Sequence, residues 1–471
     1  MHASTRRQFL KYAGAGAAAL ALPRWLTAAE AASPGERPNF VHIVLDDWGY
    51  DEASCMGHPT LVTPNIDRVA AEGMRLPQAM AGGPVCAPSR CTLMTGQHTG
   101  HCSVRINPGG TPIRADDVTL AQVLKEAGYA TGGFGKWGLG DRGTTGVPEK
   151  HGFDVFFGYY HQVHAHSYYP NYLLRNSEKV PLPGNTGDFQ KGQTYSQDLI
   201  YRESVNFIRA AKDKPFYAYL CWTPPHGVCA IPENDPAWQK YKGRQAADKK
   251  EAAEQVRSAM IEMVDRQIGE ILAILKERGL EQRTLVLLTG DNGSIPGSYD
   301  RDAKTGRSFR GNKGVLYEGG LRVFMAARWP GRIRAGAVND HLCYFPDILA
   351  TLAELAGAKP PADIDGISLV PTLLGEDKVG KKQSQHEFLY WEFGKQVAVR
   401  MGNWKAVRQT GKRSGWELYD LREDIEEAKD VAGDHPDIVA RIEAYADAAH
   451  TPERQGSVLD ASLGFQGHKA T

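Results

Sequence analysis

Residues 40–47 read FVHIVLDD, an apolar run that is broken by one histidine and followed at once by two aspartates. A short apolar run rich in β-branched residues predicts a strand buried on both faces. Such strands are typical of parallel sheets, in which polar residues just beyond the carboxyl end of a strand lie where ligands bind. The stretch therefore predicts an α/β fold with Asp46 and Asp47 at its functional edge.

Three further apolar runs have the same character, and helical patterns separate them. The runs are YATGGF (129–134), FYAYLCW (216–222) and TLVLLT (284–289). The helical patterns are TPNIDRVAAEG (63–73), TLAQVLKEAG (119–128) and AMIEMVDRQIGEILAILKERG (259–279), whose final glycine suits a helix C-terminus. This alternation predicts a large, mostly parallel but mixed sheet that helices cover on both faces.

Polar residues also follow the run 284–289, where Asp291 and Asn292 lie within the sequence GDNG. With Asp46 and Asp47 they supply four oxygen donors at equivalent strand ends. Carboxylate and amide oxygens suit Ca²⁺ or Mg²⁺ and are poor ligands for zinc. Taken singly, an Asp-Asp pair after a strand is often a helix cap, and Asp-Asn-Gly is a common turn. The four residues together predict a metal site.

The first residues and the charge balance indicate where the protein works. The chain has 55 basic residues (lysine and arginine) and 55 acidic residues (aspartate and glutamate). Its net charge therefore gives no reason to expect a nucleic-acid partner. Residues 4–23 read STRRQFLKYAGAGAAALALP, which could be a buried helix or a membrane anchor. The apolar part is too short and too weakly hydrophobic for a stable membrane span. The pattern favours a twin-arginine signal over residues 1–35, hence the export machinery as a partner and a periplasmic or secreted protein.

The stretch PVCAPSRCTLMTG (84–96) places Cys86 at the expected start of a helix, with Pro88 in its first turn. A helix N-terminus favours an anion, because its free N–H groups and the macrodipole point at it. Cys86 could be a buried thiol, one arm of a disulfide or a metal ligand. Zinc binding would recruit Cys91, Cys102 and the histidines 98 and 101, but the spacing matches no common zinc pattern. The seven cysteines are an odd number, so disulfides alone cannot account for all of them.

The segment CAPSR followed by LMTG resembles the signature of the type I, formylglycine-dependent sulfatases. Further segments resemble that arylsulfatase-like family of the alkaline phosphatase superfamily, in the same order, from about residue 38 to 450. They include GKWGLG (135–140), GFDVFFGYYHQ (152–162), TPPHG (223–227), LTGDNGS (288–294) and RGNKGVLYEGGLRV (310–323). The resemblance implies an enzyme that hydrolyses sulfate monoesters of aryl or carbohydrate alcohols, either small molecules or glycans.

The resemblance also implies a role for individual residues. A maturation enzyme would convert Cys86 to formylglycine, whose hydrated aldehyde attacks sulfur with one hydroxyl and releases sulfate when the second loses its proton. Arg90 and Lys136 would hold that hydrate, while His226 and Lys313 would contact the sulfate and the leaving oxygen. The ion would be Ca²⁺, with Mg²⁺ less favoured, and its ligands Asp46, Asp47, Asp291, Asn292 and position 86.

One position departs from the family pattern. The family commonly has histidine where this chain has Gly138, and that histidine assists proton removal from the formylglycine hydroxyl. His161, His164 and His166 follow in GYYHQVHAHSYYP, and we expect His166 to supply the missing base. The alternative is that these histidines form a strand face or an ordinary surface. Tyr159, Tyr160, Tyr168 and Tyr169 in the same region could stack on a substrate ring or fill the core.

We expect residues 36–377 to form the catalytic domain and residues 378–471 a small α+β subdomain and tail that help to shape specificity. The segments FLYWEFG, VAVRMG and WKAVRQT alternate like antiparallel strands, and PDIVARIEAYADAAH follows with a helical pattern. Two alternative functions stay open at this point. One is a phosphomonoester or phosphonate monoester hydrolase of the same superfamily, and the other is a sulfated-glycan-binding protein without activity.

Overall fold

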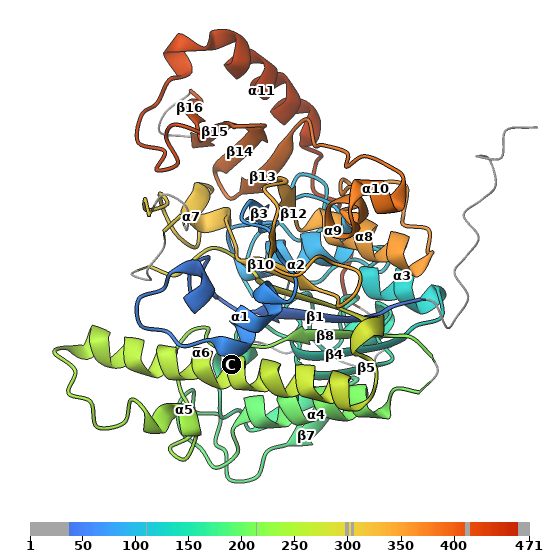
Figure 1. Cartoon of the computed structure of the whole chain (residues 1–471), viewed down its shortest axis with the longest axis vertical. Coiled ribbons are helices and arrows are strands. Elements are labelled where there is room, and N and C mark those ends of the chain that lie inside the picture. Colours follow the sequence, from blue (N-terminus) through green and yellow to red (C-terminus); the bar gives the residue numbers. More distant parts are fainter. Residues whose placement is uncertain are drawn as a thin grey trace, which may run out of the picture. The chain divides into compact units, whose positions relative to one another are not determined.

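The computed structural model describes residues 37–459 except 110, 213, 297–300, 303–305 and 410–414 (Figure 1). The predicted signal over residues 1–35 therefore lies outside the described residues. The strands of the main sheet are β1 (Asn39–Leu45), β2 (Met74–Arg75), β4 (Ala130–Lys136), β5 (Val155–Tyr159), β6 (Tyr172–Arg175), β7 (Glu178–Pro181), β8 (Phe216–Cys221), β9 (Thr284–Gly290), β10 (Met325–Arg328) and β11 (Ala337–Val338). They lie in the order β11-β2-β10-β9-β1-β8-β4-β5-β6-β7.

The centre of this sheet is parallel and its flanks are mixed. Strands β9, β1, β8, β4 and β5 run parallel to one another, with Phe40 opposite both Tyr217 and Leu285. Strands β10, β6 and β7 pair antiparallel. The four apolar runs of the sequence form β1, β4, β8 and β9, so the predicted mixed sheet is confirmed. Two short strands, β3 (Ala79–Met80) and β12 (Cys343–Tyr344), form a separate parallel pair.

Helices cover both faces of the main sheet (Figure 1). One core packs α1 (Pro64–Ala71), α4 (Ser196–Ala210) and α6 (Lys249–Glu277) against it, and the opposite core packs α2 (Cys86–Thr95), α3 (Leu120–Glu126) and α8 (Pro346–Ala356). The remaining helices are the short α5 (Pro236–Gln239), α7 (Glu318–Leu321), α9 (Val370–Leu374) and α10 (Glu376–Val379), and the C-terminal α11 (Pro436–Ala449). No helix in the described part of the chain has the length and apolar character to cross a membrane.

Local sequence sets the ends of the long helix α6. Its first turn is capped by the Asp248 carboxylate, which accepts a hydrogen bond from the backbone N–H of Glu251. Just beyond its last residue, Gly279 adopts the left-handed conformation (φ 67°) that ends many helices. The expected helix end at Gly279 is thus confirmed.

A small antiparallel sheet follows at the C-terminal end. Its strands β13 (Leu389–Phe393), β14 (Gln396–Met401), β15 (Trp404–Gln409) and β16 (Glu417–Asp420) lie in sequence order, and α11 packs on one face of them. A group of buried charges connects this sheet to α7, with Arg400, Lys405 and Arg322 around the carboxylates of Glu318 and Glu427. The Lys405 ammonium lies 2.9 Å from a Glu318 carboxylate oxygen and 3.3 Å from one of Glu427. The predicted small antiparallel sheet is confirmed, and its buried ion group reaches into the larger domain.

Replacing Lys405 by methionine should destabilise the protein, because two carboxylates would lose their shared cation in the interior. We expect Lys405→Met to lower the free energy of unfolding by about 3–5 kcal/mol, measured by urea denaturation. The exposed pair Lys381–Glu354 gives the matched control, and Lys381→Met should change stability by less than about 1 kcal/mol. Equal effects of the two substitutions would contradict a stabilising role for the buried ion group.

Candidate active site

The predicted site residues meet at one edge of the main sheet. Asp46 and Asp47 follow β1, Lys136 ends β4, His226 follows β8, and Asp291 and Asn292 follow β9. These four strands are neighbours in the order β9-β1-β8-β4 and run parallel, so their carboxyl ends lie side by side. Residues far apart in the sequence are thereby brought into contact.

Cys86 is the first residue of α2, a helix in which every residue is buried. The preceding Val85 is extended (φ −147°), so the chain turns sharply into the helix at this cysteine. The Cys86 thiol donates a hydrogen bond to Asp46 Oδ1 at 3.3 Å, and the Lys313 ammonium lies 3.6 Å from Sγ. Burial and the Asp46 carboxylate raise the pKa of the thiol, so the unmodified side chain stays protonated and is a poor nucleophile.

The aspartates provide donors for a metal ion. One ligand atom from each of Asp46, Asp47, Cys86 and His226 lies within 4.8 Å of the others. Asn292 Oδ1 is buried and has no hydrogen-bond partner among the described residues, while its amide nitrogen donates to Asp47 Oδ1 at 2.9 Å. An orphaned amide oxygen beside two carboxylates fits a hard divalent cation such as Ca²⁺.

Asp291 occupies a different place in the cluster. Its Oδ2 accepts two hydrogen bonds from the Arg90 guanidinium, at 2.8 and 3.1 Å, and its Oδ1 accepts one from the Asp47 backbone N–H at 3.0 Å. Burial and the neighbouring Asp46 carboxylate raise the pKa of Asp291. A cation at this edge would offset the repulsion between the Asp46 and Asp291 carboxylates.

Three cations face the carboxylates. Lys136 Nζ lies 2.6 Å from Asp46 Oδ2, and Lys313 Nζ lies 2.6 Å from Asp47 Oδ1. The third cation is Arg90; burial opposes ionisation of Asp46, but the charges of Lys136 and Arg90 hold its pKa well below the usual value. Asp46 and Asp47 are therefore ionised through their partners, and the cations are fixed where an anionic group would bind.

Two imidazoles stack at the same edge. The rings of His166 and His226 have centroids 4.6 Å apart, and His226 Nε2 lies 3.4 Å from Asp47 Oδ2. Burial lowers the pKa of His226 to about 3, and burial together with the Lys136 charge lowers that of His166. Both rings are therefore neutral near pH 7.

The other two histidines of the segment point elsewhere. His164 packs on the rings of Tyr159 and Tyr172, with centroid distances of 5.0 and 4.6 Å. His161 lies against the loop at Gly109, where a side-chain Cβ would come 3.1 Å from its ring. These positions leave His166 as the histidine of this segment that reaches the cluster.

Gln162 is a residue of the site that the sequence did not reveal. Gly138 has a left-handed backbone (φ 77°), and a Cβ there would lie 2.4 Å from Gln162 Nε2. That nitrogen donates to the Gly138 carbonyl at 3.3 Å, whereas Gln162 Oε1 is buried without a hydrogen-bond partner in the part of the chain that the structure describes. Gln162 thus fills the space beside Arg90 that a side chain at position 138 would need.

The structure decides two alternatives that the sequence left open. The four tyrosines of the histidine-containing segment fill the hydrophobic cores and do not form a stacking surface, with exposures of 0–7%: Tyr159, Tyr160, Tyr168 and Tyr169. The histidines considered for zinc lie with Asp365 instead of the cysteines. His98 Nδ1 accepts a hydrogen bond from the Gly100 N–H at 3.1 Å, so its proton is on Nε2 and neither nitrogen offers a lone pair to a metal.

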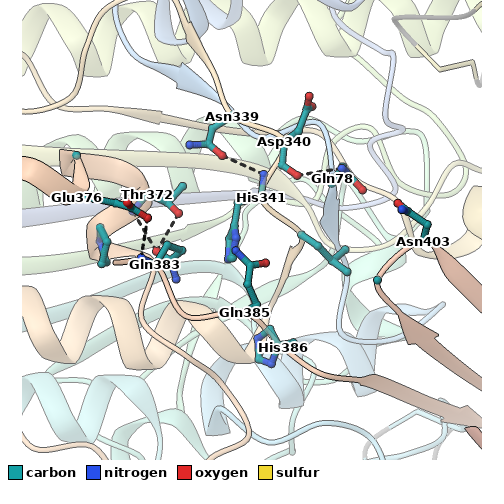
Figure 2. Close-up of a pocket in the computed structure, with 14 residues that line it drawn as sticks. Gln78, Asn339, Asp340, His341, Thr372, Glu376, Gln383, Gln385, His386 and Asn403 are labelled. Carbon is teal, nitrogen blue, oxygen red and sulfur yellow. Dashed lines mark hydrogen bonds between the residues drawn. The ribbon is translucent and has the colours of Figure 1, made fainter. Parts of the chain in front are cut away.

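A polar cavity of about 580 Å³ lies apart from this cluster (Figure 2). Its lining comes from the loop between β11 and β12, the segment around α9 and α10, and the β14–β15 turn. Figure 2 shows amide and carboxylate side chains around it, including Gln78, Asn339 and Gln383. None of the residues assigned above to metal or sulfate contact lines it, so this cavity does not define the catalytic centre.

Gly138→Ala should lower the free energy of unfolding, because the new methyl group would collide with Gln162 and the backbone is left-handed. Overpacking of this kind costs about 1–3 kcal/mol. Adding Gln162→Ala should recover the loss of stability that the collision causes. It should not recover the loss that the left-handed backbone causes. Chemical denaturation of both single variants and the double variant measures this coupling, and strictly additive effects would show that the two residues do not share the space.

Family models match most of the chain. Residues 38–358 match the family model "Sulfatase", and residues 309–445 match "N-sulphoglucosamine sulphohydrolase, C-terminal". Residues 4–23 match the twin-arginine translocation pathway signal sequence. The chain therefore carries a signal for export by the twin-arginine route, to the periplasm or the exterior.

Named relatives agree with the family match. The chain is 31% identical to the N-acetylgalactosamine-6-sulfatase of Mus musculus over 431 residues, which cover 86% of this chain and 78% of the relative. It is 32% identical to human arylsulfatase A, over 78% of this chain and 74% of the relative. The crystal structure of Ps i-CgsB superposes with a TM-score of 0.71 and 26% identity, covering 87% of this chain and 92% of that one. The chain belongs to the sulfatase family and is a sulfuric ester hydrolase.

Proposed function

We propose that this sulfatase cleaves sulfate monoesters of carbohydrate or aryl alcohols with a formylglycine that is made from Cys86. The observation that supports it most is the placement of Cys86 at the start of a buried helix, between the Asp46 carboxylate and the Lys313 ammonium. The raised pKa of the thiol makes the unmodified cysteine unsuitable as the nucleophile. Formylglycine would supply a nucleophilic hydroxyl and a second hydroxyl whose deprotonation releases sulfate.

The proposed metal ligands are Asp46, Asp47, Asp291, Asn292 and position 86, and the proposed ion is Ca²⁺. The ion would lower the pKa of the hydroxyl it contacts and neutralise charge on the sulfate oxygens. Its donor set contains a free amide oxygen and ionised carboxylates, as described above. Arg90 and Lys136 would orient the groups at position 86 and hold positive charge beside them, where one such contact is typically worth about 3–4 kcal/mol of the barrier.

Lys313 and His226 can assist departure of the alcohol. Burial opposes protonation of Lys313, but the neighbouring Asp47 and Asp46 carboxylates raise its pKa, so its ammonium keeps its proton at working pH. That ammonium can donate to the leaving oxygen. His226 is neutral and would contact the sulfate as a hydrogen-bonding group.

We assign the missing base to His166. The ring stacks on His226, and its pKa is lowered by burial and by Lys136, so a lone pair is available near neutral pH. It would accept the proton whose loss releases sulfate. Gln162 occupies the place of the absent imidazole at position 138 and, being an amide, cannot act as a base.

The substrate class follows from the relatives. N-acetylgalactosamine-6-sulfatase is named for a sulfated amino sugar and arylsulfatase A for aryl sulfates. We propose a sulfated carbohydrate as the natural substrate and an aryl sulfate as a usable model substrate. Turnover of either excludes a role limited to glycan binding.

Coexpression with a formylglycine-generating maturation enzyme should replace the Cys86 thiol by an aldehyde, which mass spectrometry of the peptide containing residue 86 detects. The converted enzyme should hydrolyse an aryl sulfate faster than the matching aryl phosphate. Cys86→Ala should reduce turnover by roughly 10³-fold or more, since no nucleophile remains. A fully active enzyme with an unconverted Cys86 would rule out the mechanism, and faster phosphate hydrolysis would favour a phosphomonoesterase.

His166→Ala should slow steady-state turnover by about 10²–10⁴-fold, the usual contribution of a general base. Release of the first equivalent of alcohol should stay rapid, so that stopped-flow measurements show a burst followed by slow turnover. His161→Ala removes a histidine of the same segment that faces the Gly109 loop and should leave both phases unchanged. If His166→Ala behaved like this control, the base would have to be sought elsewhere.

A further inference from the structure

A buried ion pair lies directly behind the metal-binding edge. Arg257 belongs to α6, and Glu52 belongs to the loop that follows Asp47. Both side chains are only 2% exposed, and Arg257 Nε donates to Glu52 Oε1 at 3.0 Å. A buried ion pair adds little to stability compared with a well-packed apolar pair. Stability alone therefore does not account for an ion pair at this place.

The remaining guanidinium donors reach the backbone of two site residues. Arg257 Nη2 donates to the carbonyl of Asp47 at 2.7 Å, and Nη1 donates to the carbonyl of Pro225 at 3.0 Å. Asp47 offers a ligand atom to the metal cluster, and Pro225 directly precedes His226, whose ring lies beside that cluster. A single side chain thus joins the loops that follow β1 and β8.

Glu52 closes the first of these loops on itself. One of its carboxylate oxygens accepts a hydrogen bond from the Gly49 N–H at 2.6 Å, and its carbonyl accepts one from the Trp48 indole at 2.8 Å. The loop needs this support because Asp47 has a left-handed backbone (φ 58°), which is unfavourable for a residue other than glycine. We call the Arg257–Glu52 pair the clamp. Without it, the backbone of Asp47 would be free to relax and to move its carboxylate away from the cluster.

We propose that Arg257 and Glu52 are positioning residues that set the affinity of the site for its divalent cation. They fix the backbone of Asp47 and the loop that carries His226, so that the ligand atoms are already in place when the ion arrives. Partners behind metal ligands commonly change metal affinity 10–100-fold when replaced. The inference rests on the proposed assignment of Asp47 as a metal ligand.

Isothermal titration of the chelator-treated, purified chain with Ca²⁺ tests this and requires no turnover. Arg257→Met should weaken Ca²⁺ binding by about 10–100-fold. Arg257→Lys keeps the charge but cannot reach both carbonyls and the carboxylate at once, so it should recover only part of the affinity. Glu52→Gln should also weaken binding, and Asp47→Ala supplies the reference without the ligand.

Arg266→Met is the matched control, because Arg266 lies on the same helix and pairs with Asp235 at 2.8 Å instead of with the site. Arg266→Met should leave the Ca²⁺ affinity unchanged. Circular dichroism of every variant identifies which ones fold without Ca²⁺. If Arg257→Met does not fold, Arg257→Lys and Glu52→Gln decide the question. Wild-type affinity in any folded Arg257 or Glu52 variant would overturn the clamp, whereas a wild-type chain that binds no Ca²⁺ would overturn the ligand assignment on which it rests.

Discussion

Carboxylates buried side by side at the ends of β1 and β9 impose the main constraint on this site. Asp46, Asp47 and Asp291 have almost no solvent exposure, and like charges at such distances repel strongly in a low-dielectric interior. Each is therefore met by a fixed cation or by hydrogen-bond donors, with Lys136 on Asp46 and Arg90 on Asp291. The same concentration of charge makes the edge suitable for a divalent ion and, once the ion is bound, for an anionic ester.

Meeting this constraint requires segments from the whole chain. Lys313 lies in a loop whose next residue, Gly314, donates its N–H to the Pro84 carbonyl at 2.9 Å, beside the start of α2. Gln396 of the C-terminal sheet donates to the Gly314 carbonyl at 3.0 Å and accepts from the Leu316 N–H at 3.2 Å. The C-terminal sheet therefore helps to hold the lysine that faces Cys86, in addition to any part it has in specificity.

The region around Gly138 shows how one altered position is accommodated. The amide of Gln162 occupies the room that a side chain at position 138 would take, and His166 approaches the cluster from the 3₁₀ turn His164–His166. Filling the space and supplying an imidazole are thus divided between two residues. An amide suits the first task because it donates to the Gly138 carbonyl without adding charge to the site.

Local patterns in the sequence were enough to predict the central strands β1, β4, β8 and β9, the sheet type, the export signal and the family, because short apolar runs and contiguous motifs lie within single segments. It also placed Asp46, Asp47, Asp291 and Asn292 at one edge, since parallel strands align their carboxyl ends. Only the tertiary structure showed that His166 lies at the cluster and that His161 and His164 lie elsewhere, since the direction of a side chain in a loop depends on packing.

The contacts of Gln162 with Gly138, and of Arg257 with Asp47, were likewise decided by the tertiary structure. The second pair is 210 residues apart, and no local pattern in either segment identifies the partner. The tyrosines at 159, 160, 168 and 169 proved to be core residues for a similar reason, because composition alone does not say which side of a segment is covered. The local sequence predicts which polar residues follow the strands. The contacts that hold those residues in position come from segments far apart in the sequence, and only their packing in three dimensions decides them.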